Sequence, residues 1–285
     1  MKRLIPRLLL APAVASLLAW MIVPLAMTVY FSIVHDNLLM PGAHRFIGLE
    51  NYRYFITDPA FWTSLVNTLE LIGAVVAITV VLGVALAQLI NEPFPGRSVV
   101  RLLLIAPFFV MPAASALLWK YMMMNPIYGM LAQLWHAFGL KPVDWLTQYP
   151  LLSIIVIVAW EWLPFSCLIF MTALQSLDRE QMEAARMDGA GALQRFWYLT
   201  LPHLKRSISI VVMIELIFLI GIFAEIFTTT GGGPGNASSN LAYLIFKDAL
   251  VDFDVGIASA GALLAVVLAN VVALFAVRSI GKNLD

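Results

Sequence analysis

Residues 8–33 read LLLAPAVASLLAWMIVPLAMTVYFSI, a run without a single charged side chain. A helix needs about 20 mostly apolar residues to cross the hydrocarbon core of a bilayer. Backbone polar groups have no water partner in lipid, so the segment must pair them internally as a helix. The run is longer than the apolar core of a secretory signal, which is about 7–15 residues. It therefore predicts a retained membrane-spanning helix.

Five further apolar runs follow it, near residues 63–90, 99–119, 151–174, 207–228 and 256–277. The chain is 61% hydrophobic and 12% charged, whereas a soluble domain has about a quarter of its residues charged. A very large apolar core is the alternative, but it would not gather its apolar residues into long uncharged runs. The sequence predicts an all-α integral membrane protein with six transmembrane helices in a single domain, residues 1–285.

Composition also excludes several classes of function. The net charge is zero, which gives no electrostatic footprint for nucleic acid. Cys167 is the only cysteine, so no disulfide within the chain can form. The four histidines lack the spacing of metal ligands. We therefore expect no nucleic-acid partner, no metal and no cofactor.

Basic residues predict the orientation of the spans. If the N-terminus is cytoplasmic, 12 of the 17 basic residues fall on the cytoplasmic side and five outside. The positive-inside rule then places both termini in the cytoplasm. The cytoplasmic residues are Lys2, Arg3, Arg7, Arg97, Arg101, Arg179, Arg186, Arg195, Lys205, Arg206, Arg278 and Lys282; the outer ones are Arg45, Arg53, Lys120, Lys141 and Lys247.

The long cytoplasmic loop, residues 175–206, has a distinctive centre that reads DREQMEAARMDGAGALQRFWYLTLPHL over residues 178–204. Asp178 is placed to cap a first short helix, with Gln181 in the reciprocal position of a capping box. Gly189 and Gly191 should break the helix. The pattern predicts an elbow of two short helices with a surface of small residues that another protein can approach closely.

This loop resembles the EAA loop of ATP-binding-cassette (ABC) import permeases. The resemblance implies the type I importer permease fold and an elbow that docks on an ATPase subunit. It also implies a second homologous permease, as a heterodimer or a homodimer, two copies of the ATP-binding subunit and a periplasmic solute-binding protein. The residues that the resemblance assigns to ATPase coupling are Glu183, Ala184, Ala185, Asp188, Gly189, Leu201 and Pro202, and Ala190 and Phe196 also match the family's pattern.

Two outer segments resemble the carbohydrate-uptake branch of these permeases. They are residues 46–52, FIGLENY, and residues 230–234, TGGGP. This branch carries sugars, polyols and glycerol phosphates, and the chain as a whole is most similar to sorbitol/mannitol-type permeases. The resemblance implies a bacterial inner-membrane protein that carries a sugar or polyol, with glycerol phosphate or an oligosaccharide as the alternative solute.

Glycines 231–235 are not followed by the lysine of a phosphate-binding loop. We therefore expect the energy source to be another polypeptide, and we expect the chain itself not to be an enzyme. Ser153 and Ser166 have no neighbouring base in the sequence to form a catalytic triad, which disfavours an intramembrane enzyme. An ion-coupled secondary transporter is a further alternative, but it would not need the elbow.

Four acidic residues, Glu70, Glu161, Glu215 and Glu225, fall within the predicted spans. A charge inside a membrane is costly and needs a partner or a wet cavity. Carboxylates can accept hydrogen bonds from sugar hydroxyls, and a tryptophan offers a stacking face. The alternative is that these acids bond neighbouring helices or the partner permease. The candidate substrate pathway consists of Trp160, Glu161, Glu215, Gly221 and Glu225.

Overall fold

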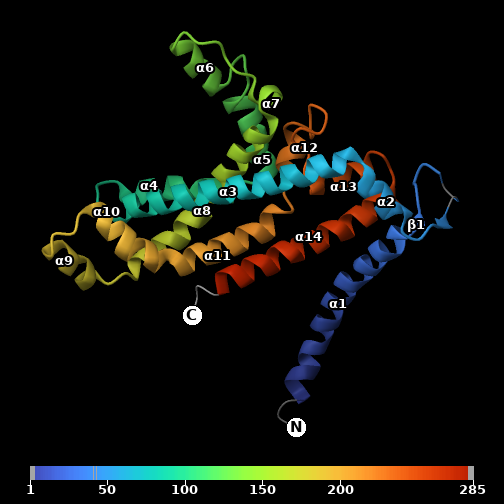
Figure 1. Ribbon diagram of the computed structural model, residues 1–285, viewed down its shortest axis with the longest axis horizontal. Helices are drawn as coiled ribbons and strands as arrows, with labels where there is room; N and C mark the ends of the chain where they lie inside the picture. The colour runs from blue at the N-terminus through green and yellow to red at the C-terminus, as the bar shows by residue number, and fades with distance from the viewer. Residues whose placement is uncertain (1–3, 41, 43, 282–285) are drawn as a thin grey trace. The chain divides into compact units, whose positions relative to one another are not determined.

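The computed structural model of the 285-residue chain describes residues 4–40, 42 and 44–281 (Figure 1). Lys2, Arg3 and Lys282, which entered the orientation count, lie outside the described residues. The described chain is almost entirely helical, and its two short strands form one antiparallel ribbon. It divides into two compact units, residues 1–62 with 244–268, and residues 63–243 with 269–285.

Four helices are long and apolar enough to cross a membrane, namely α1 (Leu4–Ser32), α3 (Pro59–Asn91), α8 (Pro150–Gln175) and α14 (Val255–Gly281). Residues 99–119, predicted as one span, form α4 (Arg97–Ile105) and the 3-10 turn η1 (Ala106–Phe109), followed by α5 (Pro112–Leu118) and the π turn η2 (Trp119–Met123). The two halves are bent by 108°. If this pair is one span, the described residues hold five.

The predicted fifth span is also divided. Residues 207–228 fall in α11 (Leu201–Leu219) and the short α12 (Ala224–Thr228), with a non-helical connection at Gly221. Lys205, Arg206 and Glu215 make α11 more polar than the four long helices. Apolar runs in a sequence do not reveal where a helix breaks. The count of six spans therefore remains a prediction.

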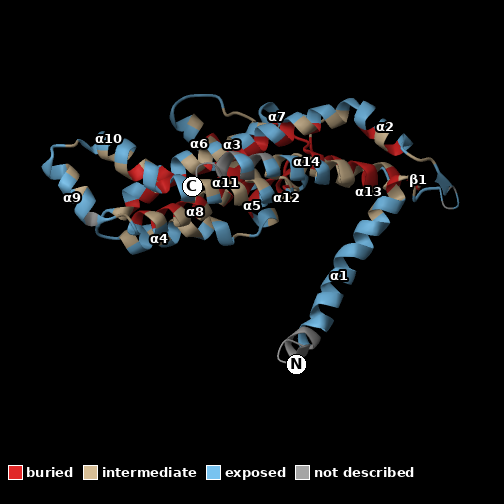
Figure 2. Cartoon of the chain, turned by 60° about the horizontal axis from the view of Figure 1, so that its bottom comes forward, coloured by how far each residue is buried: buried red, intermediate tan, exposed pale blue. Residues whose placement is uncertain are grey.

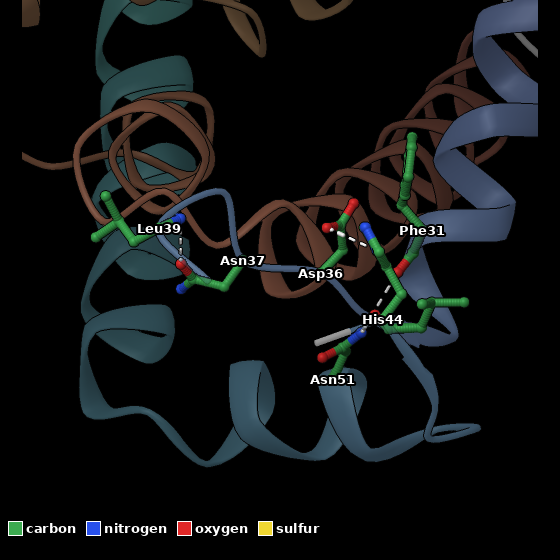
Figure 3. Close-up of polar contacts among 7 residues, drawn as sticks. Phe31, Asp36, Asn37, Leu39, His44 and Asn51 are labelled. Carbon is green, nitrogen blue, oxygen red and sulfur yellow. Dashed lines mark hydrogen bonds and ion pairs between the residues drawn. The ribbon is translucent and has the colours of Figure 1, made fainter. Parts of the chain in front are cut away.

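The smaller unit is organised around Asn51, on α2 (Glu50–Thr57). Its amide donates hydrogen bonds to the Ser32 carbonyl at 3.0 Å and the Val34 carbonyl at 2.9 Å. These bonds tie α2 to the end of α1 and to the ribbon of β1 (Val34–His35) and β2 (Arg45–Phe46), in which Val34 pairs with Phe46. Figure 3 shows Asn51 bonded to the Phe31 carbonyl at the end of α1. Asn51 is only 1% exposed, so this anchor is shielded from water. The structure thus gives a physical role to the asparagine of the FIGLENY segment.

Gly261 of α14 lets Phe55 of α2 pack directly against the helix backbone. A Cβ atom at residue 261 would lie 2.4 Å from Phe55 Cε2, and Phe55 is buried. We expect Gly261→Ala to destabilise the fold by about 1–3 kcal/mol, because overpacking forces shifts of this size. Circular dichroism during heating measures the effect.

Gly73 provides the matched control. A Cβ atom there would meet nothing within 4 Å, and replacing a glycine inside a helix by alanine gains about 0.5–1 kcal/mol. Gly73→Ala should therefore melt at the same or a higher temperature. Equal melting of the two variants would contradict the close packing of Phe55.

The larger unit has its core between α3, α8 and α11 (Figures 1 and 2). One apolar cluster centres on Leu71, Val75 and Val158, and a second on Cys167, Phe170 and Leu204. Helix α8 supplies both clusters and is the most buried of the long helices. The remaining helices of this unit are α6 (Met130–Ala137), α7 (Trp145–Gln148), α9 (Arg179–Met187) and α10 (Ala192–Arg195), with the π turn η3 (Phe196–Thr200). Helix α13 (Leu241–Leu250) begins at the end of this unit.

Candidate functional site

The predicted elbow is confirmed as two short helices separated by glycine. Asp178 caps α9, where its Oδ1 accepts a hydrogen bond from the Glu180 N–H at 2.9 Å. Gly189 follows α9 with φ +81°, a backbone conformation that favours glycine. The start of α10 is held by Gln194, whose Oε1 accepts from the Gly191 N–H at 2.8 Å. This bond is one half of a capping box, since Gly191 has no side chain to form the other half, and the sequence did not reveal it.

A hollow of about 440 Å³ lies within the elbow. Residues from the end of α9, from α10 and from η3 line it. Ala185 and Gly189 have small or no side chains, so they leave this space open. The Arg195 guanidinium donates to the Ala190 carbonyl and braces one side. The residues around the hollow are Ala185, Asp188, Gly189, Ala190, Gln194, Arg195, Tyr198 and Leu199.

Tyr198 lines this hollow and is exposed, as are two apolar residues that are next in sequence to lining residues, Met187 and Leu193. Met187 is 88% exposed, Tyr198 79% and Leu193 70%. Exposed apolar side chains clustered beside a hollow are typical of a surface that binds another protein. Of the other predicted coupling residues, Glu183 and Ala184 are exposed on α9, and Leu201 and Pro202 begin α11.

His203 closes the base of the elbow, a role that the sequence did not reveal. Its Nε2 lies 3.1 Å from Ser176 Oγ and 2.9 Å from the Ala173 carbonyl oxygen. These contacts join the end of α8 to the start of α11, so the loop leaves and re-enters the bundle at one point. Movement of the elbow is thereby linked to two core helices.

The candidate pathway residues separate into two groups. Glu215, fully buried on α11, accepts hydrogen bonds from Thr79 Oγ1 at 2.7 Å and Ser166 Oγ at 2.6 Å. Both of its oxygens are therefore occupied by hydroxyls of α3 and α8. Glu161 of α8 and Glu225 of α12 are also buried, and their carboxyl groups interact with each other. Gly221 is exposed in the connection before α12.

Trp160 packs beside Trp119 of η2, with the two ring centres 5.8 Å apart. Trp162 instead packs among Phe108, Phe165 and Phe218. Glu70 is exposed on α3 and does not join either group.

The loop around residues 230–240, predicted to lie outside, is fixed to α3. The Asn67 amide donates to the Asn236 carbonyl at 3.0 Å and the Ser239 carbonyl at 2.9 Å. Gly232 has φ +78°, and a Cβ atom there would lie 2.7 Å from the Tyr243 ring. The TGGGP segment therefore acts as a tightly folded turn, as expected of glycines without a phosphate-binding lysine.

A second hollow, of about 480 Å³, lies on the smaller unit and is lined by Asp58, Asp248, Asp252 and Asp254, among others. Burial, together with the charges of Asp252 and Asp58, raises the pKa of the Asp248 carboxyl to about 7. Asp248 lies on α13, in the predicted outer loop and outside the spans. Its ionisation is therefore a cost to the fold near neutral pH.

Stability should fall as the pH rises from about 4 to about 7, because over this range the folded chain binds a proton that the unfolded chain has released. Above about pH 7 both states are ionised and the cost is fully present. We expect Asp248→Asn to stabilise the fold there by about 1–2 kcal/mol, a figure reduced for solvent screening. Melting followed from acid to alkaline pH measures this, and a constant difference between variant and parent would contradict it.

These features define a class, a helical membrane protein with a compact loop shaped to dock another protein. The family described as "Binding-protein-dependent transport system inner membrane component" matches residues 79–285. The chain belongs to this family. This confirms the predicted ABC import permease and agrees with the expectation that the chain is a transport component rather than an enzyme.

Individual relatives support the same family assignment. The chain is 37% identical to a probable ABC transporter permease protein of Sinorhizobium fredii, over 86% of this chain and 80% of the relative. It is 31% identical to the trehalose/maltose transport system permease protein of Thermococcus litoralis, over 92% and 88%. It is 32% identical to the sulfoquinovosyl glycerol transport system permease protein of Agrobacterium fabrum, over 90% and 84%.

The fold is also shared with a solved structure. A chain from the crystal structure of a bacterial ABC transporter involved in the import of the acidic polysaccharide alginate superposes with a TM-score of 0.80. The match is 22% identical and covers 99% of this chain and 98% of the other. It confirms the importer permease fold.

Proposed function

We propose that this permease forms half of the pathway for a sugar or polyol across a bacterial inner membrane. The observation that carries the proposal is the elbow, whose hollow and exposed apolar rim form a docking surface on a chain of this transporter family. The elbow docks on one of two copies of an ATP-binding subunit. Its link to α8 and α11 through His203 transmits movement of that subunit to the core.

The elbow lies in the cytoplasm, and the chain has six spans with both termini on the same side. The excess of basic residues on that side supports this orientation. α11 and the bent pair of helices supply the two spans beyond the four long apolar helices. Alternating access then follows from movement of these helices, with the motor in a separate chain.

The remaining partners are a second homologous permease and a periplasmic solute-binding protein that delivers solute to the outer loops. The family description, which refers to dependence on a binding protein, supports the latter. A related crystal structure is described as an alginate transporter in complex with an alginate pentasaccharide-bound periplasmic protein. None of α1 is buried over its most apolar window, which leaves this helix to contact lipid or the partner permease.

The solute pathway of this chain passes Trp160, Glu161, Gly221 and Glu225. Glu161 and Glu225 come from different helices and interact with each other. Glu215, also predicted for the pathway, instead joins three helices of this chain through its two hydroxyl partners. We assign it a structural role.

Cysteine labelling tests the docking surface and its sidedness. A cysteine at Met187, the most exposed apolar residue of the elbow, is introduced with Cys167 replaced by serine. A membrane-impermeant maleimide should label it in inside-out vesicles but not in right-side-out vesicles. A short crosslinker should join it to the ATP-binding subunit. Labelling from the outer side, or absence of the crosslink in an assembled complex, would overturn the proposal.

Phe138 offers the matched control position. It is 74% exposed and lies in the predicted outer loop. A cysteine there should show the opposite sidedness and no crosslink to the ATP-binding subunit.

A further inference from the structure

A buried polar cluster lies where α5, η2, α8 and α12 meet. α5 contributes Ser115, α8 contributes Glu161 and α12 contributes Glu225. Ser115 is 0% exposed, Glu225 2% and Glu161 6%. The Glu161 carboxyl lies beside both of the other two side chains, close enough for the charge of Glu225 to act on it.

This cluster is incompletely hydrogen-bonded. Among the described residues, Glu161 Oε1, Ser115 Oγ and Trp119 Nε1 are buried and have no hydrogen-bond partner. Proteins seldom leave buried polar atoms without partners, because each such atom has lost its water without a replacement. The three atoms comprise a carboxyl oxygen, a hydroxyl and an indole N–H, so together they offer both acceptors and donors.

The contrast with Glu215 shows that incomplete bonding is not general to the acids of this core. Both oxygens of Glu215 accept short hydrogen bonds from hydroxyls of neighbouring helices. Glu161 has Ser115 beside it but no completed bond at Oε1. The cluster is thus arranged for a group that the described part of the chain does not supply.

The charges of the cluster restrict what that group can be. Two acidic side chains face each other there, and Lys120 is the only basic residue in the sequence of α5, η2, α8 and α12. Its Nζ donates to the Thr228 carbonyl at 3.0 Å and the Thr229 carbonyl at 2.9 Å. The lysine therefore fixes the end of α12. A phosphate, sulfonate or carboxylate would meet acidic groups with no free cation from these elements, and like charges repel strongly at low dielectric.

We infer that Glu161, Glu225, Ser115 and Trp119 form a binding site for the hydroxyl groups of an uncharged, polyhydroxylated solute, and that the site disfavours anionic solutes. The inference rests on the proposed function, since it concerns the same pathway. Carboxyl oxygens accept from solute hydroxyls, and the Trp119 N–H and Ser115 hydroxyl donate to solute oxygens. Trp160, which packs on Trp119, holds the indole in place.

The site is closed in this structure, since its carboxyl groups are almost fully buried. Helix α12 is only five residues long and is separated from α11 by residues 220–223, which are not helical. Entry of solute therefore requires release of the Lys120 contacts with the end of α12, and residues 220–223 allow α12 to turn relative to α11. Solute would enter when this happens.

The named relatives differ in the charge of the solute that their names give. They include a trehalose/maltose permease and an sn-glycerol-3-phosphate permease, the latter from Agrobacterium fabrum and 25% identical to this chain. Trehalose is neutral and glycerol 3-phosphate is anionic. The shared fold does not distinguish between the two, whereas the charges of the cluster do.

The test uses the complete importer in proteoliposomes, with trehalose, maltose and sorbitol as neutral probes and glycerol 3-phosphate and glucuronate as anionic probes. We expect ATP-driven uptake of at least one neutral probe to exceed uptake of both anionic probes by about tenfold or more, the factor that corresponds to one lost charge-assisted interaction. Direct binding of the probes to the purified complex without its binding protein separates this selectivity from that of the delivery protein.

Variants assign the selectivity to the cluster. Glu225→Ala and Ser115→Ala should raise the KM for the preferred probe by about tenfold and about threefold, in proportion to the hydrogen bonds removed. Co-purification of the ATP-binding subunit should not change. Glu70→Gln, a change to an exposed acid on α3, should leave uptake as it was.

The outcomes separate this inference from the proposed function. If the ATP-binding subunit fails to co-purify with the parent chain, the proposed function fails. If the complex assembles but carries an anionic probe as fast as any neutral one, carries no neutral probe, or keeps its KM in Glu225→Ala, the inference about the solute is overturned.

Discussion

Replacing Ala185 with tryptophan should lower ATP-driven uptake by about a hundredfold, which corresponds to a loss of about 2.8 kcal/mol in docking free energy. Ala185 lines the hollow of the elbow together with Gly189 and Tyr198. An indole at this position would fill the space that the small residue leaves open. The fold itself should persist, because Ala185 belongs to neither of the core clusters formed by α3, α8 and α11.

Two measurements make the prediction specific. Co-purification of the ATP-binding subunit should fall together with uptake, while the melting temperature of the purified permease should not change. Ala185→Ser is the matched control, because a hydroxyl adds one atom and leaves the hollow open; it should retain uptake. Full uptake in Ala185→Trp would show that the hollow is not where the ATP-binding subunit docks.

The elbow could be predicted from sequence because its signals are local. Asp178 two residues before Glu180, and glycine after α9, determine helix ends within a few residues of themselves. The capping of α10 by Gln194 is equally local, but glycine at its N-cap lacks the hydroxyl or carboxyl oxygen by which such caps are recognised. His203 joins α8 to α11 across the whole loop, and only the folded chain brings these positions together.

The spans were predictable as apolar runs but not as intact helices. Pro107 and Pro112 stand on either side of the bend within residues 97–123, yet Pro12 and Pro24 lie inside the unbroken α1 and Pro164 inside α8. Proline alone therefore does not determine whether a helix breaks; packing against neighbours decides it.

From the sequence, Glu161, Glu215 and Glu225 were all candidates for the solute pathway. Their positions along the predicted spans give no information about which side chains they contact. The folded chain places Glu215 against two hydroxyls and leaves Glu161 with an oxygen that none of the described residues bonds. Thr79 is 136 residues from Glu215 and Ser166 is 49 residues from it. Such contacts depend on how helices pack, which periodicity does not specify.

Glu215→Ala should therefore destabilise the permease by about 2–4 kcal/mol, from the cavity left in the core and from the loss of the partner of two buried hydroxyls. Thr79, Ser166 and Glu215 are each 0% exposed, so water cannot replace the lost carboxyl. Cys167 is next to Ser166, is fully buried and is the only cysteine of the chain. The rate at which a thiol-reactive dye labels Cys167 during heating measures the effect directly.

Glu215→Gln distinguishes a structural carboxyl from one that binds solute. The amide keeps one carbonyl oxygen as an acceptor, and its NH₂ can donate to the second hydroxyl, so the three-helix contact survives. We expect this variant to lose less than about 1 kcal/mol, the value of one neutral hydrogen bond, and to keep the KM of the parent for its preferred solute. If Glu215→Gln melted like the parent but raised the KM as Glu225→Ala is expected to do, Glu215 would belong to the pathway after all. Its position between α3, α8 and α11 would then mark the inner continuation of the solute route.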